Sequence, residues 1–384
     1  MELPNKLLSK LKNRKTSNAL RSLDTENNLI DFSSNDYLGF SKSAKIFETT
    51  HQYLIDNQIL QNGSTGSRLL SGNHKLYLEV EEKLSKFHKS DTALIFNSGY
   101  DANVGFFASV PQRGDVILYD ELIHASIRDG ITMSNAKSYK FKHNDLNDLI
   151  DLLERHSESD QDNSIFIVTE SVFSMDGDSP DLTRMAQVCQ KYNAYFIIDE
   201  AHAVGVFGQQ GCGETQRVGL EDRVFARIIT FGKALGCHGA AILGSEDLKD
   251  YLINFARSFI YTTALPPHSL ATIKEAYGQL VSSNGAENSA KLRANIQNFK
   301  YEVIKLNLQD QFIESNSAIH SCIIPGNEKV KSIAQQLQLK GFDVKPILSP
   351  TVPEGEERLR FCLHSYNSTK EITEMLTLLK NFID

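Results

Sequence analysis

The sequence lacks an apolar run long enough to cross a bilayer, and it lacks any cysteine pair of the form Cys-x-x-Cys. A membrane helix needs about 20 mostly apolar residues, so we expect no membrane association. The five cysteines are scattered, which is typical of reduced intracellular thiols and argues against disulfides and a metal site. The segment from Met1 to Lys15 lacks the apolar core of a secretory signal, so we expect a cytoplasmic protein.

Basic residues are also too few for a general nucleic-acid-binding protein. The chain has 40 Lys and Arg against 48 Asp and Glu, which gives a formal net charge of −8. Binding to phosphate backbones needs clustered basic residues in excess. We therefore expect no nucleic-acid partner.

The 384 residues exceed the usual size of one compact core, so the length favours a large domain and a smaller one. Short β-branched or aromatic runs alternate with amphipathic stretches in the middle of the chain. This alternation predicts a mainly parallel sheet flanked by helices. The clearest runs are 92–96, 116–119, 165–169, 194–198, 228–231 and 240–243.

Long helical periodicity extends from Pro267 to about Leu308, with a break at Asn284-Gly285, and a different pattern follows it. The later residues have the pattern of short strands between helices, which is typical of a small α+β domain. These expected strands are 318–324, 343–345 and 358–363, and the expected helices are 328–339 and 370–382. We therefore divide the chain into an N-terminal arm (1–45), a large domain (46–275), and a linker helix with a small domain (276–384).

An apolar strand at 194–198 runs directly into Asp199-Glu200-Ala201-His202. The carboxyl ends of strands face the crevice in which α/β sheets bind ligands. A carboxylate at that depth is partly desolvated and needs a cation, and a protonated pyridine nitrogen is such a partner. His202 could then hydrogen-bond the phenolic oxygen of the same cofactor. The alternative is that Asp199 only caps a helix.

A second apolar strand ends in Thr230-Phe231-Gly232-Lys233. A lysine at the end of a buried strand has a lowered pKa and can attack an aldehyde as a nucleophile. Most lysines are solvated, so a plain surface loop is the alternative. The order Asp199, His202, Lys233 favours a pyridoxal-phosphate site with a pyridinium-binding acid and a Schiff-base lysine.

Two turns between strands and helices could complete such a site. Gly99 and Tyr100 follow the run 92–96 and open a helix, whose free backbone amides can receive a phosphate. His124 follows the run 116–119 and could stack on a flat ring, although a lone histidine is more often structural.

The letters Asp-Glu-Ala-His at 199–202 also spell the acidic box of certain nucleic-acid helicases. That class needs a phosphate loop of the form Gly-x-x-x-x-Gly-Lys-Ser/Thr, and the sequence contains none. The net negative charge also opposes this alternative.

Taken together, six tracts resemble the α-oxoamine synthases, which are fold-type I pyridoxal-phosphate enzymes. The resemblance covers nearly the whole chain and rests on 35–39, 63–72, 169–178, 199–202, 230–233 and 350–360. It implies an α/β fold with a mainly parallel seven-stranded sheet flanked by helices and a smaller C-terminal α+β domain. It also implies a homodimer with a shared active site.

The resemblance implies a role for each residue at the cofactor. Lys233 would carry pyridoxal 5'-phosphate as a Schiff base, Asp199 would bind the pyridinium nitrogen, and His202 would bind the phenolic oxygen. His124 would stack on the ring. Further matches to cofactor-binding positions are Gly99, Tyr100, Ser174 and Thr230, with Thr262 and Thr263 reaching the phosphate in the partner subunit.

The resemblance also implies substrate contacts. Arg360, the second arginine of Arg358-Leu359-Arg360, matches the residue that holds the amino acid's carboxylate, unless it faces solvent from its strand. Arg21 and Thr351 match positions near the acyl substrate, although Arg21 could equally be an exposed helix residue. Asn35 and His124 complete the predicted substrate contacts.

Within the family, the tracts 66–72 and 174–178 favour the branch that condenses L-alanine with a pimeloyl thioester. The thioester would be carried by coenzyme A or by a carrier protein. The products would be 8-amino-7-oxononanoate, carbon dioxide and the free thiol, in biotin biosynthesis. Sister enzymes such as glycine C-acetyltransferase share the cofactor residues and remain the alternative.

Overall fold

The computed structural model describes residues 3–21, 23, 28–156 and 163–384. The chain forms two compact units. The large unit comprises residues 35–174 and 179–290, and the small unit comprises residues 1–34, 175–178 and 291–384. Residues 1, 2, 22 and 24–27 of the predicted N-terminal arm lie outside the described residues.

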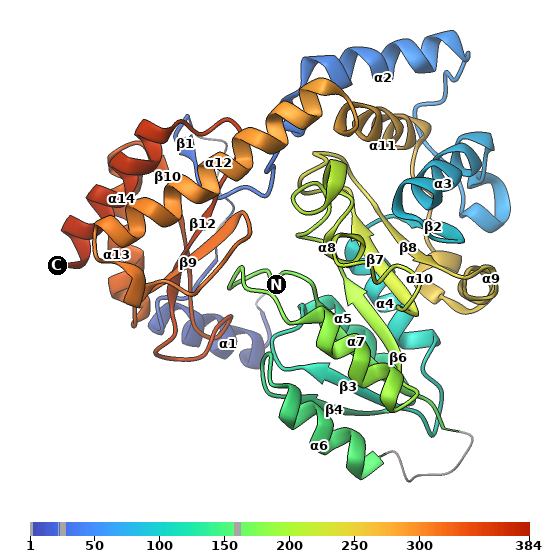
Figure 1. Cartoon of the computed structure of the whole chain (residues 1–384), viewed down its shortest axis with the longest axis horizontal. Helices are drawn as coiled ribbons and strands as arrows, with labels where there is room; N and C mark the ends of the chain where they lie inside the picture. The colour runs from blue at the N-terminus through green and yellow to red at the C-terminus, as the bar shows by residue number, and fades with distance from the viewer. Residues whose placement is uncertain (1–2, 22, 24–27, 157–162) are drawn as a thin grey trace. The chain divides into compact units, whose positions relative to one another are not determined.

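The large unit contains a seven-stranded sheet in the order β2-β8-β7-β6-β5-β3-β4 (Figure 1). Neighbouring strands from β4 to β7 are parallel, and β8 runs antiparallel to both β7 and β2. The predicted fold class is confirmed. The strands are β2 (Thr92–Phe96), β3 (Val116–Asp120), β4 (Lys137–Phe141), β5 (Ile165–Glu170), β6 (Tyr195–Asp199), β7 (Ala226–Thr230) and β8 (Ala240–Gly244).

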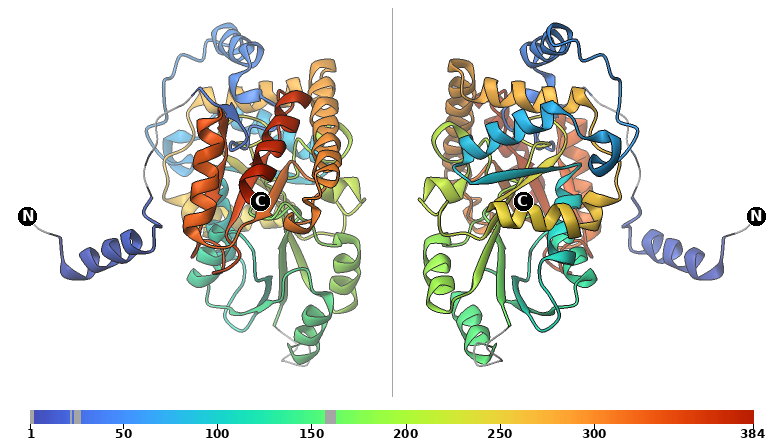
Figure 2. Two further views of the ribbon diagram at one scale, coloured as in Figure 1. Left: turned by 90° about the vertical axis from the view of Figure 1, so that its left-hand side faces the viewer. Right: turned by 90° about the vertical axis from the view of Figure 1, so that its right-hand side faces the viewer.

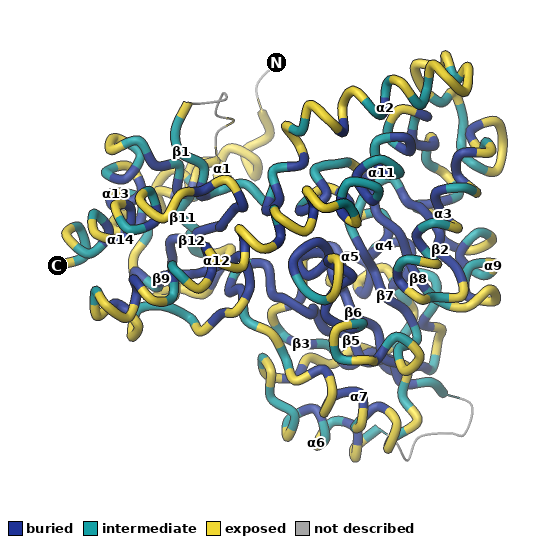
Figure 3. The backbone as a smooth tube through the Cα atoms, turned by 45° about the horizontal axis from the view of Figure 1, so that its top comes forward, coloured by how far each residue is buried: buried dark blue, intermediate teal, exposed yellow. Residues whose placement is uncertain are grey.

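Side chains from alternate positions of these strands enter two separate cores. Phe166 and Val168 of β5 pack in one core with residues of α4 (Gly99–Ser109) and α5 (Ala125–Met133). Ile165 and Ile167 pack in the other core with residues of α6 (Leu146–His156) and α7 (Leu182–Lys191). Because helices cover both faces, the central strands are mostly apolar and are among the buried parts of the tube in Figure 3.

The remaining helices of the large unit surround this sheet. They are α2 (Ala44–Asp56), α3 (Lys75–His88), α8 (Glu214–Arg217), α9 (Glu246–Phe255), α10 (Arg257–Ile260) and α11 (Pro267–Leu280). The helix α12 (Ser283–Lys305) follows and continues into the small unit. The chain breaks between α11 and α12, whereas Asn284-Gly285 lies inside α12. A side chain at Gly285 would come within 2.3 Å of the Gln279 carbonyl, so glycine permits this tight junction.

The small unit has a three-stranded antiparallel sheet in the order β11-β12-β9 and a parallel pair of β1 and β10. Its helices α13 and α14 lie side by side (Figure 2) and bury apolar faces. The α14 N-terminus has a capping box in which Ser368 and Glu371 each bond the other's backbone N–H. The elements are α1 (Asn5–Thr16), β1 (Ile30–Asp31), β9 (Ile319–Ile323), α13 (Asn327–Leu339), β10 (Phe342–Asp343), β11 (Lys345–Ile347), β12 (Arg358–Cys362) and α14 (Thr369–Ile383).

None of the helices in the described part of the chain combines the length and the apolarity that crossing a membrane requires.

Candidate active site

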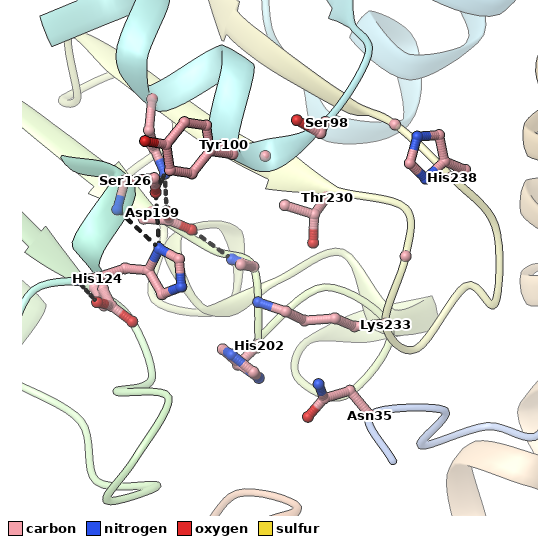
Figure 4. A pocket seen from close by; sticks show the side chains of 16 residues that line it. Asn35, Ser98, Tyr100, His124, Ser126, Asp199, His202, Thr230, Lys233 and His238 are labelled. Carbon is pink, nitrogen blue, oxygen red and sulfur yellow. Dashed lines mark hydrogen bonds between the residues drawn. The ribbon is translucent and has the colours of Figure 1, made fainter. Parts of the chain in front are cut away.

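A pocket of about 310 Å³ opens in the large unit (Figure 4). The last residues of β5, β6 and β7, which are Glu170, Asp199 and Thr230, line it, as does His124 after β3. This carboxyl edge is where open α/β sheets bind ligands. The predicted site residues that the pocket brings together are Asn35, Gly99, Tyr100, His124, Asp199, His202, Thr230 and Lys233.

Asp199 is held by hydrogen bonds to both oxygens of its carboxylate. Oδ1 accepts from the backbone N–H of Ala201 at 2.9 Å, and Oδ2 accepts from Nδ2 of Asn103 at 2.9 Å. Asp199 is only 4% exposed. The side chain is therefore an acceptor fixed in a mostly dry position at the base of the pocket.

His124 is the N-cap of α5, where its Nδ1 accepts the backbone N–H of Ser126 at 3.2 Å. The ring is open to the pocket, yet desolvation by the surrounding protein lowers the pKa of His124. The nearby Lys233 also lowers this pKa, and Asp199 partly opposes the shift. The environment of His124 therefore favours a neutral imidazole.

His202 is buried and contacts a residue of the Asn-Asp-Tyr-Leu-Gly tract. Its Nδ1 lies 2.7 Å from the hydroxyl of Tyr37, which also donates to Oδ1 of Asn35 at 3.1 Å. Tyr37 is fully buried. Tyr37 thus orients His202, a role that the sequence analysis did not assign.

Lys233 follows β7 in a tight loop. Backbone bonds close this loop from Cys237 to Phe231 at 2.7 Å and from Gly236 to Lys233 at 2.8 Å. Gly236 has φ 61°, and a side chain there would come within 2.2 Å of the Ser41 nitrogen, so the turn requires glycine. The loop directs Lys233 to the same pocket as Asp199 and His202 (Figure 4).

Glu170 is a pocket residue to which the sequence analysis gave no role. It is the register partner of Asp199 on the adjacent strand, and its Oε1 accepts the backbone N–H of His124 at 2.5 Å. Burial raises the pKa of Glu170 to about 8, and the negative Asp199 contributes to the rise. The pocket therefore contains two carboxyl groups, the negative Asp199 and Glu170, and only Glu170 tends to stay protonated.

Asn103 and Ser126 are two further pocket residues that the sequence analysis missed. Asn103 follows Gly99 by four positions in α4, so the two residues share a helix face. That spacing is the sequence signal that could have found it. Ser126 has no comparable signal beyond its place in the first turn of α5.

Three predicted residues of the large unit do not line the pocket of their own chain. Ser174 is buried, four positions beyond the end of β5. Thr262 accepts from Nδ2 of Asn97 at 3.0 Å, and the same amide bonds the Thr263 carbonyl at 2.6 Å.

The predicted substrate residues Arg21, Thr351 and Arg360 belong to the small unit. Nη2 of Arg21 donates to Oγ1 of Thr351 at 3.4 Å, so two positions far apart in the sequence meet. Arg360 is 8% exposed, which argues against a solvent-facing strand arginine. Arg358, on the same side of β12, forms a buried ion pair with Asp176.

Residues 27–379 match the model of the aminotransferase class I and II family. A curated relative from Emericella nidulans, named 8-amino-7-oxononanoate synthase, is 42% identical over 92% of this chain and 89% of its own. The chain belongs to the class I and II aminotransferase family. Because the chain belongs to this family, the alternative that it is a nucleic-acid helicase is rejected.

Two solved structures share the fold of this chain. An 8-amino-7-oxononanoate synthase from Francisella tularensis has a TM-score of 0.75 and 29% identity over 93% of this chain and 98% of that one. The serine palmitoyltransferase of S. paucimobilis, with a bound PLP-myriocin aldimine, has a TM-score of 0.88 at 24% identity over 98% and 96% of the two chains. The predicted fold-type I architecture and the predicted cofactor, pyridoxal phosphate, are confirmed.

The pocket residues of this family member fit that cofactor. Oγ1 of Thr230 is buried and has no hydrogen-bond partner among the described residues. A side chain at Gly99 would lie 2.6 Å from Cγ2 of Thr230, so glycine lets the start of α4 approach β7. The first-turn amides of α4 and this hydroxyl suit a phosphate, and buried Asp199 suits a pyridinium nitrogen.

Proposed function

We propose that this chain condenses L-alanine with a pimeloyl thioester. The products are 8-amino-7-oxononanoate, carbon dioxide and the free thiol, as needed for biotin biosynthesis. One observation carries the proposal: Lys233, Asp199, His202 and His124 line one pocket in a chain closely related to proteins named for this product. The thiol carrier is coenzyme A or a carrier protein.

Pyridoxal phosphate supplies an electron sink for the bonds that break at the Cα atom of the amino acid. Lys233 would hold the cofactor through its amine. Asp199 would bind the pyridine nitrogen, His202 the phenolic oxygen, and His124 would stack on the ring. The phosphate is assigned to the amides of Gly99 and Tyr100 and to the hydroxyls of Ser174 and Thr230. The Thr230 hydroxyl supports this assignment because it is buried and has no hydrogen-bond partner within the described part of the chain.

Lys233 would also transfer a proton when the substrate amino acid, instead of Lys233, is attached to the cofactor. Its freed amine takes the proton from Cα of L-alanine and later returns a proton to the product. Asp199 supports this step because its carboxylate, fixed by Ala201 and Asn103, favours a protonated ring nitrogen. Desolvation by the surrounding protein lowers the pKa of His124 and favours its neutral ring.

Residues of the small unit are proposed to bind the substrates. Arg360 holds the carboxylate of L-alanine through its planar guanidinium, and its low exposure supports a binding role. Arg21 and Thr351 contact the acyl substrate, which their mutual hydrogen bond supports. Asn35 and His124 contact the substrate from the large unit, where both line the pocket.

The proposed assembly is a homodimer in which Thr262 and Thr263 reach the phosphate bound by the partner subunit. Thr263 is exposed, which leaves it available for such a contact. We also propose a cytoplasmic location, which the five free cysteines support.

The test is product identification. Purified protein with pyridoxal phosphate is incubated with L-alanine and pimeloyl-CoA, and in parallel with glycine and acetyl-CoA. We expect 8-amino-7-oxononanoate by mass spectrometry from the first mixture only. Formation of 2-amino-3-oxobutyrate from the second mixture alone would make the protein a glycine C-acetyltransferase.

A further inference from the structure

A chain of hydrogen bonds joins His124 to Asp199 through two residues without an assigned role (Figure 4). Nδ1 of His124 lies 2.7 Å from Oγ of Ser126, which lies 3.0 Å from Nδ2 of Asn103. The same Nδ2 lies 2.9 Å from Oδ2 of Asp199. Ser126 is fully buried and Asn103 is 2% exposed. Water therefore has little access to the two hydrogen bonds of Asn103.

The direction of each bond follows from the chemistry of the groups. The amide nitrogen of Asn103 has two hydrogens, and it donates one to Asp199 and one to Ser126. An amide turned the other way would place its oxygen against the Asp199 carboxylate. Since Ser126 Oγ accepts from Asn103, its single hydrogen is available for Nδ1 of His124.

A second donor to the same ring nitrogen comes from the helix itself. The backbone N–H of Ser126 donates to Nδ1 of His124 at 3.2 Å, and a backbone N–H can only donate. Nδ1 is therefore an acceptor for two donors from one residue. A neutral ring in this position carries its hydrogen on Nε2, which faces away from Ser126.

The packing of two helices holds the bridge in place. A side chain at Gly130 of α5 would come within 2.9 Å of both the Asn103 carbonyl and Cβ of Phe107 in α4. The glycine thus allows α4 and α5 to approach closely enough for Asn103 to reach Ser126. The two bridging residues, Asn103 and Ser126, are buried beside the pocket.

We propose that Asn103 and Ser126 are positioning residues that fix His124 as the Nε2–H tautomer and tie its ring to Asp199. The fixed ring presents an N–H donor to the pocket, where an oxygen of a carboxylate or thioester can accept it. The substrate contact rests on the proposed function. The tautomer does not, because it follows from contacts within the protein.

The test is nuclear magnetic resonance of the holoenzyme carrying ¹⁵N-labelled histidine, repeated after removal of the cofactor. Long-range ¹H–¹⁵N correlations distinguish protonated from unprotonated ring nitrogens. A His124→Gln variant assigns the signals of His124 among the 11 histidines. We expect a protonated Nε2 and an unprotonated Nδ1 in the wild type.

Ser126→Ala removes one oxygen from the bridge, and Asn103→Leu removes the amide with little change in volume. In both variants we expect the two nitrogen shifts of His124 to move toward each other as the tautomers exchange. We expect kcat/KM for L-alanine to fall by about fivefold to tenfold, the effect of one lost hydrogen bond. Ser134→Ala, at the other end of α5, is the matched control and should leave the His124 signals unchanged.

A protonated Nδ1 in the wild type would overturn the proposal, and so would unchanged His124 signals in Ser126→Ala. A merely structural role would lower the thermal midpoint of the variants without moving these signals. If the protein made no product from L-alanine but had the expected tautomer, the proposed function would fail and the positioning role would stand.

Discussion

At the scale of the residue, the chemistry depends first on the Lys233 amine. We expect Lys233→Ala to lower turnover of L-alanine and pimeloyl-CoA on the order of a thousandfold or more, as the loss of an essential reactive group does. Borohydride treatment followed by peptide mass spectrometry should find the reduced cofactor on Lys233 in the wild type only. Lys140→Ala, an exposed lysine on β4, is the control, and near-normal turnover by Lys233→Ala would contradict the assignment.

Glu170 predicts a pH-dependent stability. Its carboxyl has a pKa of about 8 in the folded protein against 4.5 for an ordinary glutamate, because burial and Asp199 disfavour its charge. The folded chain therefore binds more protons than the unfolded chain between these values. The stability from this group is fully present below about pH 4.5 and is lost as the pH rises through about 8.

Glu170→Gln removes this loss, because glutamine does not titrate. We expect the urea midpoint of the cofactor-free variant to exceed that of the wild type by an amount that grows from about pH 5 to about pH 8 and then levels off. Glu121→Gln, a partly exposed neighbour, is the control. If the urea midpoints of the wild type and Glu170→Gln changed in parallel with pH, Glu170 would ionise in the folded chain as it does in the unfolded chain, and the prediction would be wrong.

The sequence predicted the site residues at or shortly after the ends of apolar strands, such as Asp199 at the end of β6 and Lys233 three residues after β7. It did not reveal the residues that hold them. Tyr37 meets His202 across 165 positions, and Asn103 meets Asp199 across 96. Such contacts depend on how the strands are ordered in the sheet. The spacing of Asn103 from Gly99 could place both residues on one face of α4, but it could not reveal the bond to Asp199.

At the scale of the element, a buried ion pair ties β7 to the segment that follows β6. Arg227 is 2% exposed, and its Nη2 lies 2.5 Å from Oε2 of the fully buried Glu200. The guanidinium also donates to the carbonyls of His88 at 2.9 Å and Cys212 at 3.1 Å. Asp199 precedes Glu200 at the end of β6, and Lys233 lies three residues after the end of β7, so the pair stabilises their relative position.

We expect Arg227→Met to destabilise the protein by about 3–5 kcal/mol, since it leaves the Glu200 carboxylate buried without a cation. Urea denaturation of the cofactor-free protein measures the change. The double variant Glu200→Gln, Arg227→Met also removes the unpaired charge of Glu200, so it should recover part of the lost stability. A double variant less stable than Arg227→Met alone would refute this account.

Six of the seven strands of the large sheet were predicted from their apolar runs, and β4 was not. Four of the five residues of β4 are exposed, and only Phe141 is buried. Among the described strands it is an edge strand that pairs with β3 alone, and its lysine, serine and tyrosine side chains are exposed. Apolar periodicity reports burial, so it finds central strands and misses exposed edges.

At the scale of the whole molecule, the proposed homodimer is a prediction about mass. Light scattering of the purified holoenzyme should give twice the 43.0 kDa of one chain. A mass of one chain in an active preparation would contradict a shared active site, because a complete site would then need one subunit only.

Sharing of the site can be tested with two defective subunits. Lys233→Ala lacks the reactive amine, and the double variant Thr262→Val, Thr263→Val lacks the hydroxyls proposed to reach the partner subunit's phosphate. If two-fold symmetry places both contributions in each site, a mixed dimer has one site with every group intact and one with neither contribution.

Co-expression of the two chains with different tags allows mixed dimers to be isolated by two affinity steps. We expect these dimers to have about half of the wild-type kcat per dimer, because one of two symmetric sites is intact. Each variant purified alone is the control and should be far less active. The activity of the mixed dimers could instead be no higher than the mean activity of the two parent variants. Thr262 and Thr263 would then act within their own subunit, where they contact Asn97.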